Sequence, residues 1–167
     1  MSTNRFRVTN DMLASQGQRL GNYLLDAVFQ LALTFVFTFI IGFVAVLLGN
    51  TTIVESIENL SKIEEYLLGA VVTVIYYSIF EITTGRSLGK YFTKTLVVDL
   101  GGSKPDAATI VKRSFCRLIP FNHFSFIGGG RGWHDTISDT YVVQKDVFEE
   151  KKSLFYSFEE IGVPQEN

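Results

Sequence analysis

The residues best placed to do chemistry are polar side chains at the start of a long apolar segment. Four of them recur every three or four positions and so share one face of a predicted helix: Arg19, Asn22, Asp26 and Gln30. The helix continues into residues 31–48, which carry no charge. A carboxylate at the centre of a bilayer costs about 2.5–3.5 kcal/mol, so it is usually retained for an ion pair or a transport pathway. Both roles stay open for Asp26.

A second set of polar residues lies on another apolar segment. Thr73, Tyr77 and Glu81 recur every fourth residue, and Arg86 follows shortly afterwards. If one helix enters a membrane and the next returns, Asp26 and Glu81 lie at similar depth. We predict one polar cluster at the cytoplasmic end of this helical hairpin, serving as a structural latch or as the site of transport. Its members are Arg19, Asp26, Gln30, Glu81, Arg86 and Asp135.

Catalytic and cofactor motifs are weak in this sequence. His134 beside Asp135 resembles a general base with its orienting carboxylate, but sequence neighbours rarely face one substrate, and no paired nucleophile is evident. A structural role is favoured for Asp135, which would bond Arg19, Arg131 or backbone amides. Residues 85–90 lack the spacing of a phosphate loop, and the single Cys116 favours neither a disulfide nor a zinc site. We expect no enzymatic activity, no cofactor and no metal.

Two apolar segments are long enough to position these residues across a membrane. The expected spans are residues 22–48 and 64–84, since about 20 apolar residues cross the hydrocarbon core. Basic residues flank both spans, whereas the loop between them, residues 49–63, is acidic. The positive-inside rule therefore predicts that this loop is exported and that both termini are cytoplasmic.

The part after the second span, residues 85–146, is expected to be cytoplasmic or interfacial. Strands at 95–100 and 140–144 are predicted to form a small two-stranded sheet. Residues 107–119, capped by Asp106, form a predicted amphipathic helix. Its basic face is expected to meet anionic lipid or water, although its apolar face packing on the protein is the alternative. The predicted lipid-interface residues are Lys112, Arg113, Arg117 and Trp133.

The predicted fold is an all-α membrane protein with minor β structure, in which a two-span helical hairpin carries this amphipathic helix and sheet. Residues 1–18 form a cytoplasmic N-terminal arm and residues 19–146 the membrane domain. Residues 118–127 are too short and polar to cross, so they indicate a re-entrant or interfacial segment. Residues 147–167 form a cytoplasmic tail, with one or two amphipathic turns and otherwise disorder.

Three segments together resemble the RDD family of bacterial membrane proteins, in its bacteroidetes-like form: QRLGNYLLD, GRSLGK before a VVD strand, and RGWHDTISDTYVV. The likeness runs from about residue 12 to 143. It places the family's arginine at Arg19 and its two aspartates at Asp26 and Asp135. It also implies two spans, and it departs from longer members at residues 118–127. The family is suggested to transport unknown ligands.

Two functions follow from these observations. The first is transport of an unidentified ion or small ligand across the bacterial inner membrane by an oligomer, because two spans per chain cannot enclose a pathway. The alternative is a membrane adaptor or assembly factor that recruits a partner protein or anionic lipid, with the buried charges structural. The expected partners are membrane lipids and a second copy or another membrane protein. A net charge of −2 argues against nucleic acid.

Overall fold

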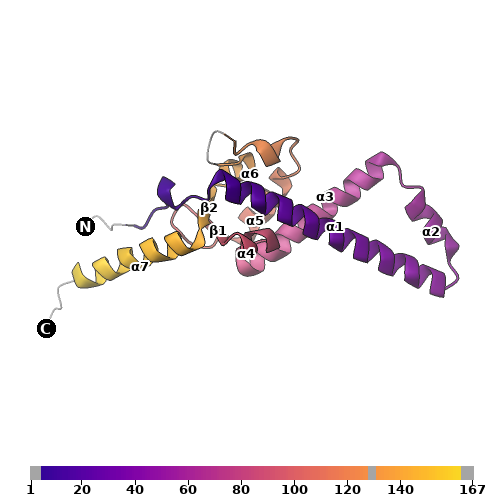
Figure 1. Ribbon diagram of the computed structural model, residues 1–167, viewed down its shortest axis with the longest axis horizontal. Helices are drawn as coiled ribbons and strands as arrows, with labels where there is room; N and C mark the ends of the chain where they lie inside the picture. The colour runs from indigo at the N-terminus through magenta and orange to yellow at the C-terminus, as the bar shows by residue number, and fades with distance from the viewer. Residues whose placement is uncertain (1–4, 128–130, 163–167) are drawn as a thin grey trace.

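The computed structural model describes residues 5–127 and 131–162 as two long helices that extend from a body of short elements (Figure 1). The long helices are α1 (Gln16–Leu47) and α3 (Lys62–Thr84), and α2 (Thr51–Glu58) lies between them. The other elements are η1 (Asn10–Met12), α4 (Leu88–Phe92), β1 (Thr95–Asp99), α5 (Ala107–Cys116), η2 (Asn122–Phe124), α6 (Trp133–Ile137), β2 (Thr140–Gln144) and α7 (Lys145–Gly162).

Helices α1 and α3 are the two candidate membrane spans. Ser15 begins α1 by accepting a hydrogen bond from the Gln18 amide, while the Gln18 side chain accepts one from the Ser15 amide, a reciprocal cap. In the most apolar 18-residue segment of each helix, only 6% of the residues of α1 and 17% of those of α3 are buried. The core helix of a soluble protein would be mostly buried. Both helices contain the predicted spans except for residue 48, and both begin earlier.

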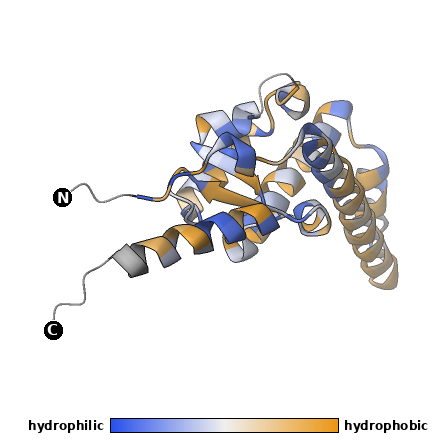
Figure 2. Ribbon diagram, turned by 60° about the vertical axis from the view of Figure 1, so that its left-hand side comes forward, coloured by the Kyte–Doolittle hydropathy of each residue, from blue (hydrophilic) through white to orange (hydrophobic). Residues whose placement is uncertain are grey.

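The apolar character of the molecule is concentrated on these two helices. Figure 2 shows hydrophobic residues along the outer part of the long helices and more hydrophilic residues in the body. The helices cross near Gln30 and Thr73, where the Thr73 hydroxyl donates to Gln30 Oε1 at 2.8 Å, and then diverge on either side of α2 (Figure 1). The body therefore gathers at one end of the candidate spans.

The predicted sheet is confirmed. Strands β1 and β2 are antiparallel, with Thr95 opposite Gln144 and Asp99 opposite Thr140. A bridge from Leu13 to Val143 and a hydrogen bond from the Ala14 amide to the Val142 carbonyl attach the N-terminal segment to β2.

The predicted N-terminal arm, residues 1–18, is attached to the body over residues 5–15. These residues pack on the sheet, because their apolar side chains cover one of its faces. The resulting core consists of Phe6, Val8, Met12, Val98, Val143 and Phe148.

The C-terminal segment differs from its prediction. Residues 145–162 form helix α7 instead of a largely disordered tail. Phe148 and Phe155 lie two helical turns apart, and both pack edge-on against Phe6, with ring centroids 5.8 and 5.6 Å from it. Lys152 adds a hydrogen bond to the Gly102 carbonyl at 2.7 Å. Helix α7 is therefore anchored near its start and projects from the body (Figure 1).

Helix α5 forms where it was predicted, although it ends at Cys116. The Asp106 carboxylate accepts from the Thr109 amide at 2.7 Å, as expected of its N-cap. The helix packs against α3 and α6. Arg113 and Arg117 are buried, so the prediction that they face lipid or water is wrong. Their acidic partners lie inside the protein.

The two other predicted interface residues are on the surface. Lys112 is exposed and so is Trp133, whose contact with lipid remains a prediction. Residues 118–127 form turns and the short helix η2, with Phe121 and Phe124 exposed and Asn122 buried. Their entry into a membrane also remains a prediction.

We predict that the N-terminal segment stabilises the folded protein. Replacing Phe6 with alanine removes its contacts with α7 and leaves a cavity, which should cost about 3 kcal/mol of unfolding free energy. The melting temperature in detergent should fall by roughly 5–10 °C. The matched control is Phe121→Ala, since the Phe121 side chain is 77% exposed. Equal melting temperatures for the two variants would show that the N-terminal packing is not needed.

Candidate functional site

Seven charged side chains are buried together where the body meets the two long helices. They come from α1, α3, α4, the end of α5, and α6: Arg19, Asp26, Glu81, Lys90, Arg113, Arg117 and Asp135. Gly85 ends α3 in the left-handed conformation, with φ of 74°, which lets the chain turn into α4. This turn brings α4 against α1 and so places Lys90 inside the protein. We call these seven residues the charge network.

Glu81 is the centre of the charge network. Its Oε2 accepts from Arg113 Nη1 at 2.5 Å, and its Oε1 accepts from Lys90 Nζ at 2.8 Å and from Arg117 Nη2 at 3.1 Å. The side chain has no exposed surface. An isolated buried carboxylate would be very costly, so these three bases are what makes the burial of Glu81 possible.

Arg113 joins Glu81 to a second acid, Asp135. Its Nη2 donates to Asp135 Oδ1 at 2.5 Å, and its Nε donates to the Thr140 hydroxyl at 3.0 Å. Arg19 Nη1 donates to the other oxygen, Asp135 Oδ2, at 2.5 Å, which ties the start of α1 to α6. The predicted pairing of Asp135 with Arg19 is thus confirmed.

The ionisation of these groups follows from their contacts. Burial lowers the pKa of Arg113, because it disfavours the charged form. The carboxylates of Glu81 and Asp135 outweigh this effect and raise the pKa of Arg113 above its ordinary value. Burial would raise the pKa of Asp135, but the positive charges of Arg113 and Arg19 hold it well below the ordinary value. Both groups are therefore charged at neutral pH.

Asp26 is held by neutral donors. Its Oδ1 accepts from the Tyr76 hydroxyl at 2.8 Å and from the Gly89 amide at 2.7 Å, and its Oδ2 accepts from the Ser87 hydroxyl at 2.6 Å. Lys90 Nζ donates to the same Ser87 hydroxyl at 3.3 Å, which connects Asp26 to the rest of the charge network. A Cβ atom at position 89 would lie 2.5 Å from the Asn22 carbonyl oxygen, so only glycine lets α4 lie this close to α1.

The predicted cluster is assembled only in part. The structure brings Arg19, Asp26, Glu81 and Asp135 together, whereas Gln30 bonds Thr73 farther along the helices. Arg86, another member of the predicted cluster, instead lines a separate cleft with Tyr91 and Lys145.

Sequence reasoning missed three members of the charge network: Lys90, Arg113 and Arg117. Arg113 and Arg117 stand four positions apart, so they share one helix face, and that spacing was the available signal. Such a face is more often solvated than buried, which is why it was assigned to the surface.

His134 is part of the structural support for Asp135. Its Nε2 lies 3.3 Å from Asp135 Oδ1, and its Nδ1 lies 3.0 Å from Asn122 Oδ1. Burial lowers the pKa of His134, and the positive charges of Arg117, Arg113 and Lys90 lower it further. Asp135 raises the pKa but is outweighed, so the pKa of His134 lies well below its ordinary value. The ring is therefore neutral at physiological pH. Its contacts position α6 against η2.

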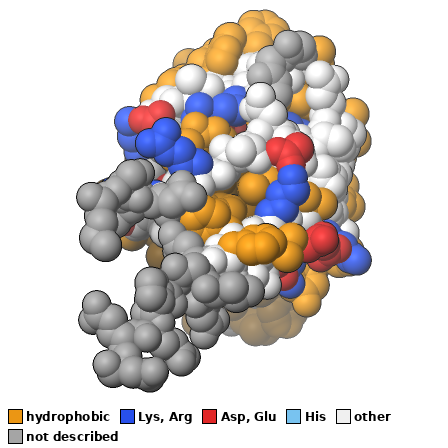
Figure 3. Space-filling view, turned by 90° about the vertical axis from the view of Figure 1, so that its left-hand side faces the viewer, with side chains coloured by type: hydrophobic (Ala, Val, Ile, Leu, Met, Phe, Trp, Pro, Cys, Tyr) orange, Lys and Arg blue, Asp and Glu red, His pale blue; other side chains and the backbone are white. Residues whose placement is uncertain are grey.

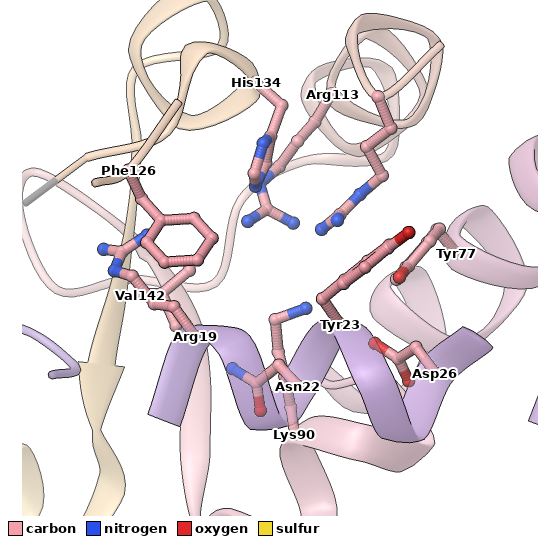
Figure 4. Close-up of a pocket in the computed structure, with 11 residues that line it drawn as sticks. Arg19, Asn22, Tyr23, Asp26, Tyr77, Lys90, Arg113, Phe126, His134 and Val142 are labelled. Carbon is pink, nitrogen blue, oxygen red and sulfur yellow. The ribbon is translucent and has the colours of Figure 1, made fainter. Parts of the chain in front are cut away.

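A small cavity of about 30 Å³ borders the charge network. Figure 4 shows Lys90 and Arg113 directed toward this space from different elements, with Asp26 and Tyr77 at one side. The cavity is lined by Arg19, Asn22, Tyr23, Asp26, Tyr77, Lys90, Arg113, Arg117, Phe126, His134 and Val142.

Some donors at the cavity have unused hydrogen-bonding capacity. Arg19 Nη2 and Arg117 Nε are buried and have no hydrogen-bond partner among the described residues. The Arg117 guanidinium stacks on the Tyr77 ring at 3.7 Å from its centroid. Burial lowers the pKa of Lys90, against the opposing effect of Glu81. Within the described part of the chain, no group of three or more His, Cys, Asp or Glu residues is arranged to hold a metal.

Comparison with known proteins gives one match. A sequence profile of the RDD family matches residues 13–139, which include every member of the charge network. No curated protein and no solved structure matches the chain.

We predict that Arg113 is the most important single base for stability. Replacing it with methionine leaves Asp135 with one basic partner and removes the closest one from Glu81, which should cost about 3–5 kcal/mol of unfolding free energy. The matched control is Lys112→Met, because Lys112 is exposed on the same helix. Thermal unfolding in detergent measures both.

A conservative variant supplies the second arm of this test. Arg113→Lys keeps a positive charge between Glu81 and Asp135 but loses the two-sided guanidinium contacts, so it should lose less stability than Arg113→Met. If Arg113→Met unfolds at the same temperature as Lys112→Met, the charge network does not hold the body together.

Proposed function

Because the chain belongs to the RDD family, we propose that it is a membrane protein that transports a small ion or ligand as an oligomer. The observation that carries the proposal is the cavity beside the charge network, at one end of two helices long and apolar enough to cross a membrane. The proposed location is a bacterial inner membrane, with both termini cytoplasmic. The charge network then lies at the cytoplasmic end of the spans.

A purely structural role explains the charge network less well. Buried ion pairs can often be replaced by apolar residues without loss of stability, so stability alone is a weak reason to retain seven charged groups. The cavity also leaves two guanidinium nitrogens without partners among the described residues. Polar groups with spare capacity beside a cavity favour a binding site for something that comes and goes.

A polar path leads from the charge network toward the middle of the helices. Gln30 stands one helical turn, about 6 Å, beyond Asp26 on α1 and accepts from Thr73 on α3 at 2.8 Å. The Thr34 hydroxyl, one turn farther on, donates to the Gln30 carbonyl at 2.9 Å. Two helices cannot surround such a path, so further copies are needed to close it. Polar groups between helices also favour helix association within membranes.

The alternative function is a membrane adaptor, and helix α7 favours it. This helix projects from the body, and its Leu154, Tyr156 and Phe158 side chains are exposed (Figure 1). Figure 3 shows Lys and Arg side chains interspersed with Asp and Glu at this end, so no single sign of charge dominates the described part of that face. Such a surface fits a protein partner better than anionic lipid.

The transport proposal predicts ion flux that depends on Asp26. Purified protein in liposomes should carry H⁺, Na⁺, K⁺ or Cl⁻ down an imposed gradient, and Asp26→Asn should reduce that flux because Asp26 lies between the cavity and the polar path. The matched control is Glu55→Gln, since Glu55 is exposed on α2, outside the charge network. Flux is read by ion-selective dyes.

Two results of this assay would contradict transport. Wild-type liposomes that leak no faster than empty ones would leave the adaptor as the better proposal. Equal flux through wild type and Asp26→Asn would remove the charge network from the pathway.

The proposed orientation makes a separate prediction. In a Cys116→Ala background, a cysteine at Asn59 should react with an impermeant maleimide in intact cells, because it lies between α2 and α3. A cysteine at Lys104, between β1 and α5, should react only after the membrane is opened. The opposite labelling pattern would reverse the orientation, and labelling of both sites in intact cells would exclude a two-span hairpin.

A further inference from the structure

The wall of the cavity is strongly cationic. Four basic residues line it, whereas Asp26 is the single carboxylate among the eleven lining residues. Glu81 and Asp135 contact the same bases but are not among the lining residues. An object inside the cavity therefore meets positive charge on most sides.

The charge network as a whole also carries excess positive charge. It contains four bases and three acids, and the 2.8 Å contact of Lys90 with Glu81 favours the charged form of that lysine. The Asp26 carboxylate is already surrounded by three neutral donors, from Tyr76, Ser87 and Gly89. One positive charge is thus left without a counter-charge in a buried setting, which is costly.

The donors needed to hold a counter-charge are present. Arg19 Nη2 and Arg117 Nε have no partner among the described residues, and both side chains are more than nine-tenths buried. Lys90 Nζ donates to Glu81 and Ser87, and an ammonium has three protons. These three side chains belong to α1, α4 and the residue that follows α5, and all of them line the cavity.

The size of the cavity limits the ligand. A volume of about 30 Å³ is roughly twice that needed for one ordered water, which is enough for one ion of chloride size. Sulfate or a phosphate ester, each with several oxygens around a central atom, would have to extend out of this volume. Water would fill the space but would not supply the missing negative charge.

We propose that this cavity is a binding site for one small monovalent inorganic anion of chloride size, held by Arg19, Lys90 and Arg117. The inference rests on the proposed transport function, since it names the class of ion for the same site. Binding and flux are nevertheless measured separately, so either can fail without the other. The apolar side chains of Phe126 and Val142 complete the wall, and they favour a weakly hydrated anion over a strongly hydrated one.

Anion binding is measured directly on the purified full-length protein. Protein in chloride-free gluconate buffer is titrated with sodium chloride or sodium bromide at constant ionic strength, and melting temperature and calorimetric heat are recorded. Chloride and bromide should raise the melting temperature and saturate, because a ligand bound only to the folded state stabilises it. Sodium sulfate, added under the same conditions, should have no saturable effect.

Two variants locate the site. Arg117→Gln removes one donor but leaves Glu81 paired with Lys90 and Arg113, and it should weaken chloride binding about tenfold or more. Val142→Leu keeps every charge and fills part of the cavity, so it should abolish the chloride response while the protein stays folded. The matched control is Lys112→Gln, whose exposed side chain lies outside the cavity.

The results separate this inference from the transport proposal. Saturable chloride binding in wild type, lost in Val142→Leu, supports the anion site even if liposomes show no flux. The absence of a saturable chloride or bromide response overturns the anion site even if liposomes carry a cation. A response that is equal in wild type and Val142→Leu also overturns it, because the anion then binds elsewhere.

Discussion

The burial of Glu81 is the constraint on which the rest of the body depends. A carboxylate without solvent contact needs nearby positive charge, and Glu81 receives it from Lys90, Arg113 and Arg117. These bases belong to α4, to α5 and to the residue after α5, so both helices must pack at the end of α3. Arg113 then draws in Asp135 and with it α6. The sheet and the N-terminal segment close the body around these contacts.

Asp26 and Asp135, the two aspartates that the family resemblance singles out, are stabilised differently. Asp135 is balanced by guanidinium groups, as Arg113 and Arg19 contact its two oxygens. Asp26 receives an amide and two hydroxyl groups instead. Neutral donors stabilise a carboxylate without cancelling its charge, so Asp26 remains an electrostatic influence on the cavity and on the helical path beyond it. For the proposed transport function, this difference makes Asp26 a better candidate than Asp135 for contact with the ion.

Local patterns in the sequence predicted some of this structure well. Long apolar runs and β-rich segments located α1, α3 and the sheet, because hydropathy and strand propensity act over neighbouring residues. The partners of Glu81 were missed because a helical wheel shows that Arg113 and Arg117 share a face, but not what that face meets. Lys90 was missed because helical spacing does not show the left-handed turn at Gly85, which brings α4 back against α1. Packing of the N-terminal segment and α7 through Phe6 depends on contacts between the two ends of the chain.

The order of residues along the chain bears on how the protein is made. Glu81 precedes all three of its basic partners, so α3 leaves the ribosome before Arg113 and Arg117 have been synthesised. Until α5 follows, the carboxylate can avoid a costly unpaired burial only by remaining in contact with water at the membrane surface. With the two long helices as the proposed membrane spans, their insertion precedes closure of the body around Glu81. A nascent chain that stops before α5 presents an incomplete hairpin whose Glu81 lacks Arg113 and Arg117.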